Sequence, residues 1–186
     1  MEKSVKKLYV FDFDETLVLN KGSLYIQKQE GTILKLDRSI HKIKFEKEDK
    51  ILWKEFNDIS NFISVPEMVN KFLKLIQDPE NYVCICTARY YKEPVELYLS
   101  DILKLEQEIE IGTVGEKDFI SNNYEYYEKL VGIRKKNWIL NKVEKLSPKE
   151  VYFFDDNQFN VNEVLKLRKV LDIPVKVFKV NVTKKK

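Results

Sequence analysis

The chain has 186 residues, of which 44% are hydrophobic and 34% charged, a balance typical of a globular domain with a full core. Its 33 basic and 30 acidic side chains leave a formal charge of +3, which is too even to indicate nucleic-acid binding by itself. The single histidine, His41, largely excludes histidine-based triads and histidine-rich metal sites. Cys84 and Cys86 lie two residues apart in one apolar run, a spacing that suits buried thiols in a reducing compartment rather than a disulfide.

The first residues carry no apolar region of the kind found in signal peptides, and no apolar stretch approaches the ~20 residues that cross a membrane. We therefore expect a cytoplasmic protein without a membrane partner. The basic tail, residues 183–186, is expected to be solvated.

The first predicted strand covers residues 7–12, where an apolar run ends in Asp12 and Asp14. Residues 23–36 are typical of two short strands around a turn at residues 30–31. Three later apolar residues are candidates for a third strand: Ile40, Ile43 and Phe45. Residues 51–64 are ambiguous, although their aromatic and apolar residues hint at helical spacing.

Strands and helices then alternate. Strands are predicted over about residues 82–86, 109–114, 151–154 and 175–180, and helices over about residues 66–77, 93–105, 133–146 and 160–171. Residues 115–132 are interpreted as a loop with a short helix at most, whose tyrosines (Tyr124, Tyr126 and Tyr127) either cover the core or stack on bases. The alternation predicts an α/β fold, a three-layer Rossmann-like sandwich with a mostly parallel sheet. We expect one domain over residues 1–186, with its core in about 1–17 and 65–181 and a small β-hairpin insertion over about 18–64.

Three apolar strands end in polar side chains. The first leads into Asp12 and Asp14, the second into Thr87, and the third into Asp155 and Asp156. Because the carboxyl ends of parallel strands share one edge of the sheet, these groups should meet in one crevice. The carboxylates would repel one another, and a divalent cation would offset this repulsion. An all-oxygen set of ligands indicates Mg²⁺.

The strand ends also resemble a known family. Residues 12–17 (DFDETL), 83–87 (VCICT) and 151–156 (VYFFDD) are similar, in this order, to the first, second and fourth motifs of the haloacid dehalogenase superfamily of phosphohydrolases. The third motif of that family is a lysine at a helix start before the last of these strands, and Lys135 and Lys136 both fit. We favour Lys136, because it extends the apolar face of Ile139 and Val143, whereas Lys135 is rotated toward solvent.

The resemblance implies a phosphatase that works through an aspartyl-phosphate. Asp12 would attack phosphorus, and Asp14 would protonate the leaving oxygen and then accept a proton from water. Thr87 and Lys136 would hold phosphoryl oxygens. Arg89 would steer a phosphate, although a solvated or sheet-edge arginine is an equal alternative.

The same resemblance implies the ligands of the cation. Mg²⁺ would be held by Asp12, by the backbone carbonyl of Asp14 and by Asp155. Asp156 would either be a further ligand or accept a hydrogen bond from a group that itself binds the cation.

The substrate is less well defined by the sequence. Without a large cap, the site would be open to a nucleic-acid end or a protein. Residues 14–18, 87–88 and 91–95 resemble phosphatases that act on phosphoserine in polymerase tails, whereas residues 87–89 resemble small domains associated with RNA and polynucleotide end repair. A nucleotidase and a non-catalytic binding module are the remaining alternatives, and the oligomeric state is open.

Overall fold

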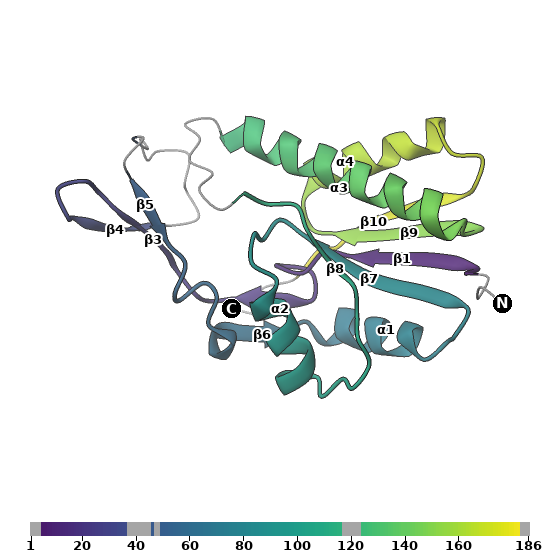
Figure 1. Cartoon of the computed structure of the whole chain (residues 1–186), viewed down its shortest axis with the longest axis horizontal. Helices are drawn as coiled ribbons and strands as arrows, with labels where there is room; N and C mark the ends of the chain where they lie inside the picture. Colours follow the sequence, from purple (N-terminus) through teal and green to yellow (C-terminus); the bar gives the residue numbers. More distant parts are fainter. Residues whose placement is uncertain (1–4, 37–45, 47–48, 117–123, 183–186) are drawn as a thin grey trace.

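The computed structural model describes residues 5–36, 46, 49–116 and 124–182, which form an α/β fold around one five-stranded sheet (Figure 1). The strands of this sheet are β1 (Lys7–Phe11), β7 (Asn81–Thr87), β8 (Ile111–Thr113), β9 (Glu150–Asp155) and β10 (Val175–Lys179). Their order is β10-β9-β1-β7-β8, and every neighbouring pair is parallel. The predicted α/β fold with a mostly parallel sheet is confirmed.

The order of the strands reverses at β1. From β1 the chain proceeds outward through β7 and β8, and then it returns to the other side of β1 to add β9 and β10. In open parallel sheets, such a reversal leaves a crevice at the carboxyl ends of the two strands that flank it, and ligands bind there. Here those two strands are β1 and β9.

Helices cover both faces of the sheet (Figure 1). They are α1 (Pro66–Ile76) and α2 (Glu93–Leu97) on one face, and α3 (Tyr124–Leu146) and α4 (Gln158–Leu165) on the other. A π-helical turn (Tyr98–Ile102) continues α2, and a 3-10 turn (Lys166–Lys169) continues α4. Side chains along β1 alternate between the two cores, as a strand requires: Tyr9 and Phe11 face α1, and Leu8 and Val10 face α3.

Local sequence explains where α1 begins. Pro66 occupies the first turn, where its fixed φ suits a helix and its missing N–H costs no helical hydrogen bond. Met68, Val69 and Phe72 then lie on one side of the helix and are buried against the sheet. On the opposite face, Cys84 and Cys86 are buried free thiols.

The insertion after β1 forms two small antiparallel sheets. At its base, β2 (Val18–Asn20) pairs with β6 (Phe62–Ser64), so the chain leaves and re-enters the core at neighbouring points. Beyond this base, β3 (Leu24–Gln27), β4 (Ile33–Leu36) and β5 (Lys50–Leu52) form a sheet of order β4-β3-β5. Gly31, at φ 90°, occupies the predicted turn between β3 and β4. In Figure 1 this sheet lies on the side where β1 ends.

Two segments differ from the sequence-based expectations. Residues 51–64 contain most of β5, a 3-10 helix (Ile59–Asn61) and β6 rather than an α-helix, because the two ends of this segment pair with β3 and β2. The predicted loop 115–132 is wrong in its second half, because α3 already begins at Tyr124. The tyrosines and charged residues there show no apolar residues at helical spacing, so a helix could not be predicted from the pattern.

Some expectations fall outside the part of the chain that the structure describes. They concern the candidate third strand (Ile40, Ile43 and Phe45), the side chains of Tyr124, Tyr126 and Tyr127, and the basic tail. Among the described residues, no helix is long and apolar enough to cross a membrane.

Candidate active site

The carboxyl ends of β1 and β9 bring two acids together. Phe11, the last residue of β1, lies opposite Phe154 of β9, so the strands end in register. The backbone N–H of Asp12 continues the ladder by donating to the carbonyl oxygen of Phe154 at 2.8 Å. Asp12 and Asp155 therefore emerge side by side at the crevice where the strand order reverses.

Three carboxylates gather at this point. One oxygen from each of Asp12, Asp155 and Asp156 lies within 4.8 Å of the others. Asp12 and Asp155 are buried, and burial raises the pKa of Asp12 well above its usual range, against the opposing charge of Lys135. Burial and the adjacent charge of Asp155 raise the pKa of Asp156 to about 7. The cluster is thus short of positive charge.

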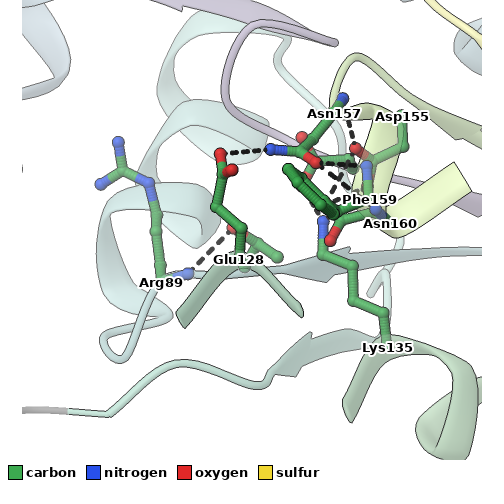
Figure 2. A network of polar contacts seen from close by, with 9 residues as sticks. Arg89, Glu128, Lys135, Asp155, Asn157, Phe159 and Asn160 are labelled. Carbon is green, nitrogen blue, oxygen red and sulfur yellow. Dashed lines mark hydrogen bonds and ion pairs between the residues drawn. The ribbon is translucent and has the colours of Figure 1, made fainter. Parts of the chain in front are cut away.

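A lysine from α3 reaches into the cluster (Figure 2). The ammonium of Lys135 donates to Oδ1 of Asp12 at 2.5 Å and to Oδ2 of Asp155 at 2.7 Å, and its side chain is 1% exposed. Burial disfavours the charged ammonium, but the two carboxylates outweigh this effect and raise the pKa of Lys135 above its usual value. Lys135 therefore stays charged and neutralises part of the cluster.

The choice of Lys136 for this role is wrong. Its side chain is 25% exposed, and its ammonium lies 3.9 Å from Glu163 on α4. The reason is that α3 packs against two partners: Val131, Lys135 and Ile139 are buried toward the sheet at a spacing of four residues, whereas Lys136 faces α4.

The contact between α3 and α4 is close because of a glycine. A Cβ atom on Gly132 would lie 3.0 Å from Cγ of Glu163 and 3.2 Å from the backbone oxygen of Phe159. Gly132 therefore lets α4 approach the turn of α3 that precedes Lys135. This approach places the start of α4 beside the cluster.

Protein donors occupy both oxygens of Asp155. Oδ1 accepts from the backbone N–H of Asn157 at 2.8 Å, and both oxygens accept from the side-chain amide of Asn160 at 3.0 Å. With Lys135 on Oδ2, the four lone-pair directions of this carboxylate are used. Asp155 therefore suits the task of holding Lys135, whereas Asp12 and Asp156 offer oxygens to a cation.

Asn157 connects this carboxylate to both helices (Figure 2). Its side-chain oxygen caps α4 by accepting from the backbone N–H of Phe159 at 2.8 Å, and its amide donates to Glu128 of α3 at 2.8 Å. Sequence analysis missed Asn157, Asn160 and Glu128. The available signal was a helix cap directly after paired acids, with Asn160 on the first turn facing back toward them.

Asp14 lies apart from the cluster. Its two carboxylate oxygens accept from Nε and Nη2 of Arg89, each at 2.7 Å. Of the four acids expected to bind a cation, the described structure thus brings three together through their side chains. A contribution from the backbone carbonyl of Asp14 stays a prediction.

Arg89 follows β7 by two residues at the edge of the sheet, as one of the alternatives expected, but it is not solvated. Its role in steering a phosphate stays a prediction. Arg89 is 4% exposed, and its Nη1 donates to Oδ1 of Asn57 at 3.0 Å. Nearby, Thr87 ends β7 and is buried, and its hydroxyl oxygen accepts from the backbone N–H of Arg89 at 3.2 Å. The hydroxyl hydrogen of Thr87 can still be donated to another acceptor.

The residues at the crevice fit a divalent cation. Three carboxylates face one ammonium, and oxygen is the ligand that Mg²⁺ prefers. Asp12 and Asp156 have oxygens that would hold the ion, whereas donors occupy both oxygens of Asp155, whose role as a ligand stays a prediction.

Comparisons with known proteins identify no family for the chain. No family model matches it, and no curated protein matches it. A matching solved structure is the UDP-GlcNAc 2-epimerase of Neisseria meningitidis bound to UDP-GlcNAc, with 12% sequence identity and a TM-score of 0.45. That match covers 97% of this chain, which spans about a third (33%) of the epimerase chain. These findings contradict the membership in the haloacid dehalogenase superfamily that the motifs suggested.

Proposed function

We propose that this protein is a Mg²⁺-dependent phosphohydrolase that removes a phosphoryl group through an aspartyl-phosphate on Asp12. One observation carries the proposal: three carboxylates and one buried ammonium meet at the crevice between β1 and β9. The excess of carboxylates over cations in this cluster supports the proposal, because a bound divalent cation would offset it and would attract an anionic phosphoryl group.

Asp12 is the nucleophile in this proposal. Lys135 binds Oδ1 of Asp12 and fixes the orientation of the carboxylate, so we assign the attack on phosphorus to Oδ2. The new bond joins Oδ2 to phosphorus as the bond between phosphorus and the leaving oxygen breaks. Asp14 enters this step as the carboxylic acid, gives its proton to that oxygen and becomes the carboxylate that Arg89 holds.

Water completes the reaction. Its oxygen attacks phosphorus, its proton passes to Asp14, and the bond between phosphorus and Asp12 breaks to release inorganic phosphate. Thr87 donates its hydroxyl hydrogen to a phosphoryl oxygen, and Lys135 offsets charge on Asp12 as the carboxylate is regenerated. When bound, Mg²⁺ supplies charge neutralisation for the transferring group.

The experiment measures phosphate release with MgCl₂ from aryl phosphate, mononucleotides, a phosphopeptide, and oligonucleotides phosphorylated at the 3′ or the 5′ end. Asp12→Asn should reduce turnover by at least ~1000-fold, because an amide is a poor nucleophile for this step. Asp101→Asn is the matched control, since this acid is exposed and pairs with Ser100 away from the site.

A second readout identifies the covalent step. Wild-type protein quenched in acid during turnover should carry one phosphoryl group on the peptide that contains Asp12, detected by mass spectrometry. Turnover that survives Asp12→Asn, or a phosphoryl group on another residue, contradicts the proposal. The preferred substrate of the panel distinguishes nucleic-acid ends from nucleotides and phosphoproteins.

A further inference from the structure

Arg89 and Asp14 form an ion pair with two hydrogen bonds. Nε and Nη2 of Arg89 hold both oxygens of Asp14 at 2.7 Å, so the two planar groups lie in one bidentate arrangement. Such a pair fixes the position and the plane of the carboxylate at once. Asp14 is therefore oriented by Arg89 rather than by its own short side chain.

Arg89 is itself held by the insertion. Its Nη1 donates to the side chain of Asn57 at 3.0 Å, and Nη1 and Nη2 reach the backbone oxygen of Phe56 at 3.5 and 3.4 Å. Every nitrogen of the guanidinium thus has an acceptor. Arg89 cannot bind a phosphate unless it gives up one of these partners.

Aromatic rings surround the remaining faces of the guanidinium. Its central carbon lies 4.4 Å from the ring centre of Phe56, 5.0 Å from that of Phe62 and 5.4 Å from that of Phe13. Rings at these distances attract the cation and exclude water from it. Phe56 and Phe62 belong to the insertion, whereas Phe13 lies between Asp12 and Asp14 in the sequence.

The segment that carries Phe56 and Asn57 is fixed at its base. The side-chain amide of Asn20, on β2, donates to the backbone oxygen of Phe56 at 2.9 Å. A Cβ atom on Gly22 would lie 2.1 Å from the backbone oxygen of Glu55, so the two chain segments touch there. The position of Arg89 therefore depends on the insertion being packed against the core.

We propose that Arg89 is a positioning residue that aligns Asp14 for both proton transfers, and that Phe56 and Asn57 of the insertion hold Arg89 in that alignment. This inference rests on the proposed function, since it assigns Asp14 a proton to give and to take. It adds that the insertion completes the alignment of the site. Arg89 acts through Asp14 and does not touch the reacting atoms.

The test compares leaving groups. A dinitrophenolate leaves without a proton, so 2,4-dinitrophenyl phosphate can form the aspartyl-phosphate without help from Asp14, whereas an alkyl phosphate cannot. Hydrolysis of the aspartyl-phosphate needs Asp14 as a base in both cases. In Arg89→Ala we therefore expect a burst of about one equivalent of dinitrophenolate followed by slow turnover. With an alkyl phosphate, kcat should fall about 100-fold without a burst.

Two further variants separate positioning from folding. Arg89→Lys keeps the charge but loses the bidentate geometry, and it should show the same burst. Asn57→Ala leaves the ion pair between Arg89 and Asp14 in place. It should lower kcat for the alkyl phosphate several-fold more than it lowers the rate of dinitrophenolate release. Arg168→Lys is the matched control, because this exposed arginine binds the backbone oxygen of Val175 at the start of β10, the end of the sheet opposite the site.

The outcomes are distinguishable. Recovery of the slow phase of Arg89→Ala by added guanidinium chloride supports positioning, because the free cation can occupy the vacated place. Equal losses with both substrates and no burst, in variants that melt like wild type, overturn the role of Arg89. An Asn57→Ala variant with unchanged leaving-group dependence overturns the role of the insertion. Turnover that persists in Asp12→Asn contradicts the proposed function itself, whatever Arg89 does.

Discussion

The two cation–carboxylate contacts of the crevice differ in their charge balance. Lys135 faces Asp12 and Asp155, with Asp156 beside them, so three acids share one ammonium. Arg89 faces Asp14 alone, and neutral acceptors and aromatic rings occupy the rest of its surface. The half with Lys135 therefore has more acids than cations, whereas in the half with Arg89 one acid faces one cation.

This difference indicates a division of tasks. An ammonium is a compact charge that can serve several acceptors from one point, whereas a guanidinium fixes one carboxylate in a plane. The half with Lys135 suits chemistry in which charge moves, and the half with Arg89 suits the precise placement of one acid. Whereas the Arg89 variants described above test one half, the half with Lys135 is tested by removing its charges or their supporting hydrogen bonds.

The largest expected effect comes from two adjacent lysines. Lys135→Met leaves Asp12 and Asp155 buried without their shared cation, so the free energy of unfolding in EDTA should fall by about 3 kcal/mol. Lys136→Met removes a long, half-buried contact with Glu163 (3.9 Å) and should cost less than ~0.5 kcal/mol. Urea unfolding of both variants measures the contrast. Equal losses would mean that Lys135 does not carry the charge balance of the cluster.

A smaller effect should appear in the dependence of stability on pH. The pKa of Asp156 is raised to about 7 in the folded protein, so its protonated form favours folding and this contribution is lost as the pH rises through that value. Without a divalent cation, the melting temperature should therefore fall between about pH 5 and about pH 8. MgCl₂ should raise the melting temperature again, because the cation offsets the negative charge of the ionised Asp156.

Asp156→Asn isolates this contribution. Near pH 8 in EDTA, the free energy of unfolding of the variant should exceed that of wild type by about 2 kcal/mol. Its melting temperature should change little when MgCl₂ is added. Asp101→Asn, at an exposed position, should leave the pH profile unchanged. A wild-type melting temperature that rises over this interval, or that falls equally in Asp156→Asn, contradicts the assigned role of Asp156.

The smallest expected effect concerns the support of Asp155. Asn160→Ala removes two hydrogen bonds to this carboxylate and should reduce the free energy of unfolding by about 1 kcal/mol. Because Asp155 then holds Lys135 less firmly, affinity for Mg²⁺ measured by calorimetry should fall about tenfold. Asn162→Ala is the matched control, since this side chain lies on the same helix and pairs with Gln158 at the surface. Equal effects of the two variants would remove Asn160 from the site.

The sequence predicted the sheet well, because its signals were local. Buried strands appear as continuous apolar runs, and each of β1, β7 and β9 ends where a polar residue interrupts its run. The meeting of Asp12 with Asp155 followed from the rule that parallel strands end at one edge. These inferences needed no knowledge of how side chains pack.

The contacts of individual side chains were harder to predict. The choice between Lys135 and Lys136 depended on the rotation of α3, which its simultaneous contacts with the sheet and with α4 determine. The contact of Arg89 with Asn57 depended on a loop of the insertion, and the apolar residues of that loop follow no clear spacing pattern in the sequence. Asn160 is an ordinary helix residue until α4 is placed beside Asp155.

The central place of β1 also affects how the protein is made. β1 pairs with β9, in which Glu150 lies opposite Lys7, and the contact between Asp12 and Lys135 joins residues 123 positions apart. At typical rates of translation, a ribosome needs about 7 to 30 s to proceed from β1 to β9. During that interval the nascent chain can add β7 to one edge of β1, while the other edge waits for its partner. The crevice therefore cannot form on an emerging chain until β9 has left the ribosome.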